Sequence, residues 1–199
     1  MIAIIDCGCG NLNSVKKALD YLGVSSVITN DSATITSANR IILPGVGSFG
    51  YFMKKLREKN LEEPIKDAIL KGVPFLGICL GLQVLFEQSE ESQGVKGFEI
   101  FAGNVKKFVQ GKIPQIGWNK IKPKEEKEKE NQNIFNSEYM YFVNSYYVVP
   151  KDESIVAATS GYYKDFTCAI QKDNVTAVQF HPEKSGKAGI SILRKWLAC

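Results

Sequence analysis

The stretch from Val73 to Phe86, VPFLGICLGLQVLF, most restricts the folds open to this chain. Its apolar residues lead into the turn Gly77-Ile78-Cys79-Leu80-Gly81, and a short apolar run that ends in turn residues is typical of a buried parallel strand. The apolar residues after the turn have helical spacing, so the pattern predicts a helix there (Leu82, Leu85, Phe86). A sharp strand-to-helix turn lifts one side chain above the sheet and requires small residues on both sides of it, as the two glycines provide.

Cys79 stands at this turn, where its thiol could act as a nucleophile. A helix that begins after the turn stabilises a thiolate, and backbone N–H groups at the same turn can hold an oxyanion. The alternative is that Cys79 is a small buried apolar side chain, the usual state of a free cysteine. The pattern Gly-x-Cys-x-Gly does not decide between the two, and a nucleophilic thiol also needs a base.

The base has one candidate, because the chain contains 1 histidine. His181 follows a predicted strand at 175–180, and Pro182 prevents that strand from continuing. Catalytic groups are commonly carried where a strand ends in a loop, and Glu183 is close enough to orient the imidazole. The alternative is a surface histidine beside a turn. Together with Cys79 a triad is the better interpretation, because nucleophile, base and orienting carboxylate are then all present.

Composition predicts one globular domain over residues 1–199. Hydrophobic residues make up 44% and charged residues 23%, which is ordinary for a chain with a sizeable core. The net charge of +4 lies largely in mixed-sign runs, so we expect no nucleic-acid partner. No segment approaches the ~18 apolar residues of a membrane span, and the first residues do not resemble a signal peptide. The 5 cysteines, an odd count, predict reduced thiols and a cytoplasmic protein.

The order of predicted elements favours an α/β fold. Residues 2–6 and 24–29 predict strands on either side of a helix that Asn11 or Asn13 caps and Gly23 ends. We expect further strands at 40–43, 73–79, 139–149, 155–160, 166–171 and 175–180, short strands within 97–108, and helices at 51–58, 61–71 and 187–197. A βαβ start predicts a mostly parallel central sheet with helices on both faces.

Two motifs near the start carry weaker signals. Cys7-x-Cys9 suggests a metal site, but zinc pairs usually have wider spacing and the histidine is already assigned, so small side chains in a Gly-rich turn are the better interpretation. Gly8-x-Gly10 lacks the third glycine and the acidic partner of a dinucleotide site.

Several motifs together resemble one family. Gly77–Gln83 with Gln179–Glu183 resembles the class I, triad-type glutamine amidotransferases. Four further motifs, which extend the resemblance over most of the chain, narrow it to the glutaminase subunits of imidazole glycerol phosphate synthase (Ile4–Val15, Leu43–Phe49, Gly117–Asn119, Tyr141–Tyr147). The resemblance implies a flavodoxin-like α/β fold with an added antiparallel section. It also implies a heterodimer with a (β/α)₈ synthase subunit, which receives the ammonia and makes imidazole glycerol phosphate and an aminoimidazole carboxamide ribotide in histidine biosynthesis.

The resemblance also implies a chemistry and its residues. Cys79 attacks the side-chain amide of glutamine, His181 protonates the leaving ammonia, and Glu183 orients His181; this chemistry needs no cofactor or metal. The other implied roles are an oxyanion hole (Val46, Gly47, Leu80), a glutamine site (Gly45, Gln83, Glu91, Asn144, Ser145, Tyr146) and a partner interface (Asn11, Trp118).

Several of these residues also have structural interpretations. The segment around Val46 could simply join a strand to a helix with Ser48 as N-cap, and both interpretations can hold. Glu91 could be a solvated residue at a helix end, indistinguishable from Glu90 without the resemblance. Trp118 by itself would be assigned to the core.

The sequence departs from the family at Gln115 and Asn144, where the family usually has histidine. This leaves the triad intact but motivates an alternative, a paralogous glutaminase subunit that supplies ammonia to another synthetase, such as one that amidinates a cell-surface sugar. A cysteine hydrolase or peptidase is disfavoured by the glutamine-site motifs. A non-catalytic regulatory partner is disfavoured by the complete triad.

Overall fold

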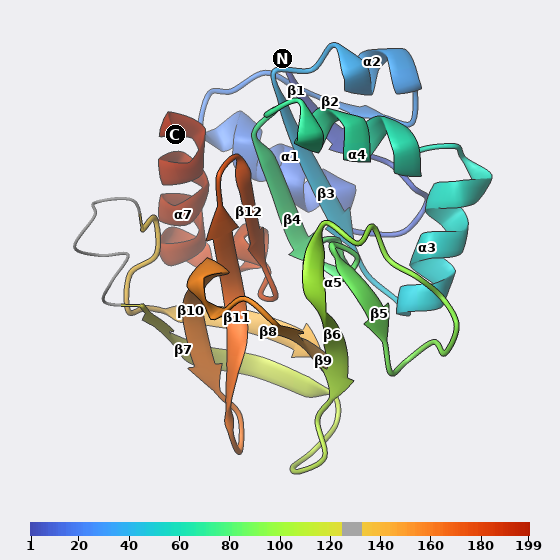
Figure 1. The fold of residues 1–199 in the computed structure, drawn as a ribbon. Coiled ribbons are helices and arrows are strands. Elements are labelled where there is room, and N and C mark those ends of the chain that lie inside the picture. Colours follow the sequence, from blue (N-terminus) through green and yellow to red (C-terminus); the bar gives the residue numbers. More distant parts are fainter. Residues whose placement is uncertain (125–132) are drawn as a thin grey trace.

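Twelve strands of a computed structural model form one sheet, with the order β2-β1-β3-β4-β12-β11-β10-β7-β8 and a branch of β9, β6 and β5 (Figure 1). The structure describes residues 1–124 and 133–199. The charged run at 122–133, for which the sequence predicts a solvated loop or a frayed helix end, therefore lies largely outside the described residues. No helix in the described residues is long and apolar enough to cross a membrane.

The first half of the sheet is parallel, as the βαβ start predicts. Neighbouring strands in the order β2-β1-β3-β4-β12 all run in the same direction. They are β1 (Ile2–Ile5), β2 (Ser26–Thr29), β3 (Arg40–Gly45), β4 (Phe75–Cys79) and β12 (Val175–Val178). Because the carboxyl ends of β3, β4 and β12 meet at one edge, side chains from the loops that follow them can converge there.

The second half of the sheet is antiparallel. It contains β11 (Asp165–Lys172), β10 (Val156–Gly161), β7 (Gln115–Pro123), β8 (Tyr139–Asn144), β9 (Tyr146–Pro150) and β6 (Phe101–Lys107), while the short β5 (Phe86–Ser89) pairs parallel to β6. The strand predicted over 139–149 is two strands, because the chain leaves β7 at Ser145 and then pairs with β6 and β11. Together the two halves confirm the expected α/β class with an added antiparallel section.

Helices cover both faces of the parallel half (Figure 1). Ile2 and Ile4 of β1 belong to a buried cluster with residues of α1 (Leu12–Tyr21) and α7 (Gly186–Ala198). Ala3 and Ile5 point to the opposite cluster, which contains residues of α2 (Ser32–Thr36), α3 (Phe49–Glu58) and α4 (Glu62–Leu70). Successive strand residues face opposite sides, so a strand buried on both faces is apolar throughout. Two 3₁₀ helices, η1 (Glu153–Ile155) and η2 (Pro182–Lys184), complete the described elements.

The prediction that the helix after Cys79 extends to Phe86 is wrong. The helix after Cys79, α5 (Leu80–Gln83), has 4 residues, and Phe86 begins β5. The Val84 carbonyl accepts from Phe98 N–H, and the Leu85 carbonyl accepts from Ile100 and Phe101. These hydrogen bonds to residues 98–101 take the place of the bonds that a longer helix would make. The helical spacing of the apolar residues Leu82, Leu85 and Phe86 therefore reflects their burial in the core and not a continuing helix. The segment with Glu90 and Glu91 is consequently a strand end and turn.

Candidate active site

The chain turns sharply at Cys79, as the sequence predicts. Cys79 has φ 57° and ψ −106°, a left-handed conformation that costs a non-glycine residue about 1–3 kcal/mol and is concentrated at functional sites. The glycines beside it leave no room for a side chain. A Cβ at Gly77 would lie 2.4 Å from the Gly81 carbonyl oxygen, and one at Gly81 would lie 1.9 Å from the Leu43 carbonyl oxygen.

Gly81→Ala is therefore expected to destabilise the fold. The added methyl group would push β3 and α5 apart, because the atom it meets is a backbone oxygen that no rotamer change can move. Overpacking of this kind costs about 3 kcal/mol. Chemical denaturation should show a lower midpoint, with Gly161→Ala as a control: like Gly81, Gly161 has no positive φ, and an added Cβ there would meet only the Asp165 carboxylate, at 3.4 Å. An equal loss in both variants would mean that the close contact with the Leu43 carbonyl oxygen does not decide the cost.

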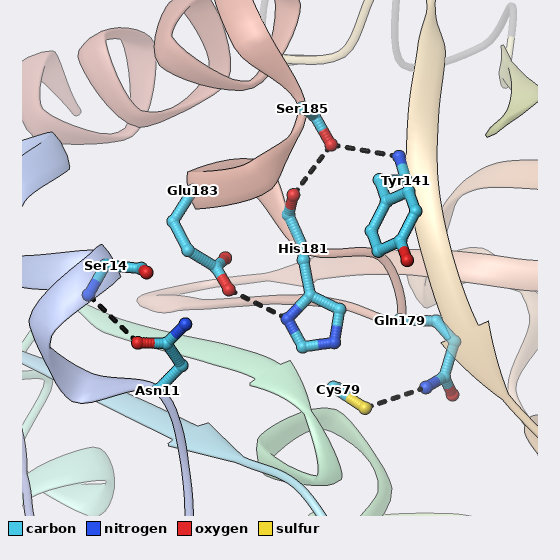
Figure 2. A network of polar contacts seen from close by, with 8 residues as sticks. All are labelled: Asn11, Ser14, Cys79, Tyr141, Gln179, His181, Glu183 and Ser185. Carbon is cyan, nitrogen blue, oxygen red and sulfur yellow. Dashed lines mark hydrogen bonds and ion pairs between the residues drawn. The ribbon is translucent and has the colours of Figure 1, made fainter. Parts of the chain in front are cut away.

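His181 and Glu183 form the hydrogen-bonded pair that the triad requires. His181 Nδ1 lies 2.8 Å from Glu183 Oε1, and the two side chains are only 4% and 2% exposed. Figure 2 shows the imidazole ring between Glu183 and the Cys79 side chain, with the second ring nitrogen turned away from Glu183. Cys79 comes from the end of β4 and His181 from the chain after β12, so adjacent parallel strands bring the two together.

Backbone bonds hold His181 in place, and one of its partners was not foreseen in the sequence. The His181 N–H donates to the Tyr141 carbonyl at 2.9 Å, and its carbonyl accepts from Ser185 Oγ at 2.6 Å. Ser185 Oγ in turn accepts from the Tyr141 N–H at 3.0 Å, which joins β8 to the turn after His181 (Figure 2). The buried Ser185 is thus a structural member of the site. A serine in a loop gives no sequence signal for such a role.

The surroundings of His181 favour its protonated form. Burial lowers the pKa of His181, but hydrogen bonds to Cys79 and Glu183 and the negative charges of both raise the pKa from 6.5 to about 10. This places a protonated ring beside Cys79, the residue that the sequence suggests as nucleophile. A cysteine beside a histidine is a typical arrangement for a nucleophilic thiol.

A cavity of about 250 Å³ opens beside Cys79 and gathers most of the predicted residues. Those that line it are Val46, Gly47, Cys79, Leu80, Gln83, Glu91, Asn144, Ser145, Tyr146 and His181. Gly45 and Glu183 do not line it; Gly45 pairs with Cys79 in the β3–β4 register, and Glu183 lies behind His181. Three lining residues were not singled out from the sequence: Pro114, Val143 and Lys184.

Glu91 connects this cavity to the loop after β3. Its Oε2 accepts a 2.6 Å hydrogen bond from the Phe49 N–H, and the Ser92 hydroxyl accepts from the Gly50 N–H at 3.0 Å. Ser48 occupies the N-cap position of α3, but its side chain makes no capping bond. Ser48 is thus the N-cap residue, as the sequence predicts, but side chains from a distant turn and not its own hydroxyl satisfy these N–H groups.

The two departures from the family pattern are neighbours. Gln115 and Asn144 lie directly opposite each other in the β7–β8 register, and they are 1% and 5% exposed. Asn144 Nδ2 donates to the Tyr146 carbonyl at 3.0 Å, whereas Asn144 Oδ1 and both polar atoms of the Gln115 side chain have no hydrogen-bond partner among the described residues. The changes at residues 115 and 144 thus alter one site, not two.

The two residues expected at a partner interface are both exposed. Asn11 caps α1 by accepting from the Ser14 N–H at 3.3 Å, which decides between Asn11 and Asn13 as cap. Trp118 is 52% exposed and stacks edge-on against Tyr141, with 5.9 Å between ring centroids. The core assignment for Trp118 is wrong, because alternate residues of β7 face solvent.

Fold and site together define a triad-type amidotransferase. A family model described as glutamine amidotransferase class-I matches residues 3–198, and the chain belongs to this family. The class I fold is also that of a solved structure titled "Crystal structure of glutamine amidotransferase", with a TM-score of 0.79 and 17% identity over 100% of this chain and 98% of that one.

Within the family, the chain groups with imidazole glycerol phosphate synthase subunit HisH. It is 48% identical to HisH of Trichodesmium erythraeum over 201 residues, 99% of this chain and 94% of that protein. It is 47% identical to HisH of Methanocaldococcus jannaschii over 198 residues, 99% of this chain and 98% of that protein.

Proposed function

We propose that this chain hydrolyses glutamine at Cys79 and passes the ammonia to a synthase subunit in histidine biosynthesis. The observation that carries the proposal is the buried Cys79, His181 and Glu183 triad at the mouth of a cavity. The HisH relatives support the pathway, and they do not favour the alternative of a subunit that serves surface-sugar amidination. The hydrolase activity belongs to this chain and the ring-forming lyase step to its partner.

The first step is attack of the Cys79 thiolate on the carboxamide carbon of glutamine. The carbonyl π electrons move to oxygen, and the N–H groups of Leu80 and of the Val46–Gly47 unit hold the oxyanion. As this intermediate collapses, the C–N bond breaks and protonated His181 transfers its proton to the leaving nitrogen. Ammonia leaves, and a γ-glutamyl thioester remains on Cys79.

The second step is hydrolysis of that thioester. Neutral His181 takes a proton from a water molecule as the water attacks the thioester carbon. The C–S bond breaks, glutamate leaves, and Cys79 returns to the thiolate beside an imidazolium. Glu183 keeps the ring oriented through both steps and stabilises its positive charge.

The remaining cavity residues suit the rest of the substrate. Glu91 supplies a carboxylate for the α-ammonium group, and Asn144, Ser145 and Tyr146 also line the cavity. Burial and the negative charges of Glu91 and Glu90 raise the pKa of the Tyr146 phenol, so the phenol stays a neutral donor at physiological pH.

Glu91→Gln is expected to raise KM for glutamine by about tenfold and to lower kcat as well, because a charge-assisted bond to the ammonium is lost and the bond to Phe49 N–H is weakened. Steady-state glutamate release measures both constants. Glu90→Gln is the matched control: Glu90 accepts from the Lys107 N–H and does not line the cavity. A larger effect at Glu90 than at Glu91 would contradict the assignment.

The exposed face of β7 and β8 is the proposed contact with the (β/α)₈ subunit in a heterodimer. Ile116 and Trp118 are exposed and lie opposite Val143 and Tyr141 in the strand register. Val143 also lines the cavity, so this apolar face continues to the mouth of the site. An exposed aromatic and aliphatic face beside a site that releases ammonia suits a partner that receives it.

Trp118→Ala is expected to weaken binding of the synthase subunit by about 2 kcal/mol, or about thirtyfold in Kd, since tryptophan is the commonest energetic anchor of interfaces. Calorimetric titration with the purified subunit measures the change. Leu70→Ala is the control, because Leu70 is even more exposed than Trp118, at 75% against 52%, but ends α4, away from β7 and β8 (Figure 1). Equal affinities for the wild type and Trp118→Ala would remove Trp118 from the interface.

The function is tested by glutamate release from glutamine, with and without an imidazole glycerol phosphate synthase (β/α)₈ subunit and its ribonucleotide ligand. We expect release that the complex stimulates at least tenfold. Release without any stimulation would keep the glutaminase activity and exclude this partner. The free state of all five cysteines accords with a reducing cytoplasm, which we propose as the location.

A further inference from the structure

Two buried glutamines, Gln83 and Gln179, connect the triad to the cavity wall. Gln179 is completely buried and lies two residues before His181. Its Nε2 donates to Cys79 Sγ at 3.6 Å (Figure 2), and its Oε1 accepts from Gln83 Nε2 at 3.0 Å. Gln83 Nε2 also donates to the Tyr146 carbonyl at 3.3 Å. We call this chain of contacts from Tyr146 through Gln83 and Gln179 to Cys79 the amide relay.

The two ends of the amide relay determine which way each amide points. The Tyr146 carbonyl can only accept a hydrogen bond, so Gln83 presents its NH₂ group to it. A thiolate at Cys79 also can only accept, so Gln179 presents its NH₂ group to the sulfur and its oxygen to Gln83. One polar atom is then left over: Gln83 Oε1 is buried and has no partner among the described residues, although Gln83 lines the cavity.

We propose that Gln179 is a positioning residue with two effects: it stabilises the Cys79 thiolate directly, and through Gln83 it fixes a hydrogen-bond acceptor for the NH₂ group of the substrate carboxamide. The second effect rests on the proposed glutaminase function. A hydrogen bond to a charged acceptor is about twice as strong as a neutral one, and burial strengthens it further. A fixed acceptor favours a carboxamide, which donates, over the carboxylate of glutamate or an ester oxygen, which does not.

The thiolate effect is tested by the rate at which iodoacetamide alkylates Cys79 between pH 5 and pH 10. Cys199 is the exposed thiol, so every protein carries Cys199→Ser. In Gln179→Met we expect alkylation at neutral pH to slow about tenfold, with the rate profile moved to higher pH, because the sulfur loses its donor. Gln83→Met should keep the wild-type profile, since Gln179 still reaches the sulfur. Gln171→Met is the control. Gln171 lies on β11 and pairs with Thr176 of β12, whereas Gln179 follows the end of β12.

The substrate effect is tested by the ratio of kcat/KM for glutamine to that for glutamate γ-methyl ester, measured in complex with the synthase subunit. Gln83→Met removes the acceptor, and Gln179→Met leaves the Gln83 amide with only its 3.3 Å bond to the Tyr146 carbonyl, so both should lower the ratio at least fivefold. Gln171→Met should not change it. Gln179→Asn, which keeps an amide but shortens the side chain by one methylene group, is made beside Gln179→Met, and circular dichroism verifies that each variant folds.

An unchanged alkylation profile in a folded variant of Gln179 would overturn the thiolate effect, and an unchanged substrate ratio would overturn the fixed acceptor. Alkylation uses no glutamine, so it reports on Gln179 even if the proposed function fails. Failure of the proposed glutaminase function would be recognised separately: the wild-type protein would be alkylated readily at Cys79 but would release no glutamate from glutamine.

Discussion

Cys79→Ala is expected to reduce glutamate release by about five to six orders of magnitude, to the uncatalysed background, because the nucleophile of the proposed covalent mechanism is removed. The fold should remain, since the alanine Cβ occupies the position of the cysteine Cβ and the close contacts at this turn are made by its glycine neighbours. Binding of the synthase subunit should also remain. The measurement is glutamate release at saturating glutamine with the synthase subunit present, beside thermal unfolding of both proteins.

Cys168→Ala is the matched control for this experiment. Cys168 is completely buried in the apolar cluster that also contains Cys79, and burial raises the pKa of the Cys168 thiol well above its ordinary value. It is therefore a protonated, unreactive thiol, and its removal should leave glutamate release within about twofold of wild type. Glutamate release that survives in Cys79→Ala but is lost in Cys168→Ala would refute the assignment of the nucleophile.

Glu183→Gln is expected to lower kcat roughly a thousandfold, because an orienting carboxylate that is replaced by its amide no longer stabilises the imidazolium or the correct tautomer. The 2.8 Å contact to His181 Nδ1 is the geometry that the substitution disturbs. Glu99→Gln, at an exposed position, controls for the loss of one negative charge. If kcat fell by less than about fivefold in Glu183→Gln, this carboxylate would not orient the base.

The same substitution should shift the pH dependence of kcat in a defined direction. In the wild type the pKa of His181 is raised to about 10, so the imidazolium needed to protonate ammonia persists until the pH rises through that value. Without the charge of Glu183 the pKa falls, and the alkaline limb moves to lower pH. Stability follows the same sign: the contribution from protonated His181 is complete below pH 6.5 and is lost as the pH rises through about 10.

The parallel half of the fold, the sharp turn at Cys79 and the place of His181 after a strand end could be predicted because each has a local signature. The apolar run before Cys79 and its flanking glycines indicate a buried strand and a sharp turn, and Pro182 places His181 after a strand end. The structure adds the distance between His181 and Glu183 and the adjacency of β4 and β12. The role of Glu91 was predicted from the family resemblance, because no local sequence pattern distinguishes Glu91 from its neighbour Glu90.

Long-range pairing could not be predicted from the sequence. The segment from Leu82 to Phe86 has helical spacing, yet it bonds to residues 98–101, which the pattern of one segment cannot reveal. The exposure of Trp118 follows from strand alternation in a sheet whose outer face is uncovered. Gln179 lies inside a motif that the sequence singled out for its histidine, but its contact with Cys79 spans 100 residues of chain.

The most direct test of the central claim, covalent attack by Cys79 on glutamine, is labelling with a diazoketone analogue of glutamine in the presence of the synthase subunit, followed by peptide mass spectrometry. The account predicts label on Cys79 alone among the 5 cysteines, loss of labelling in Cys79→Ala, and protection by excess glutamine. Glutamine-protected labelling of a different residue, or labelling of Cys79 that glutamine does not slow, would contradict it.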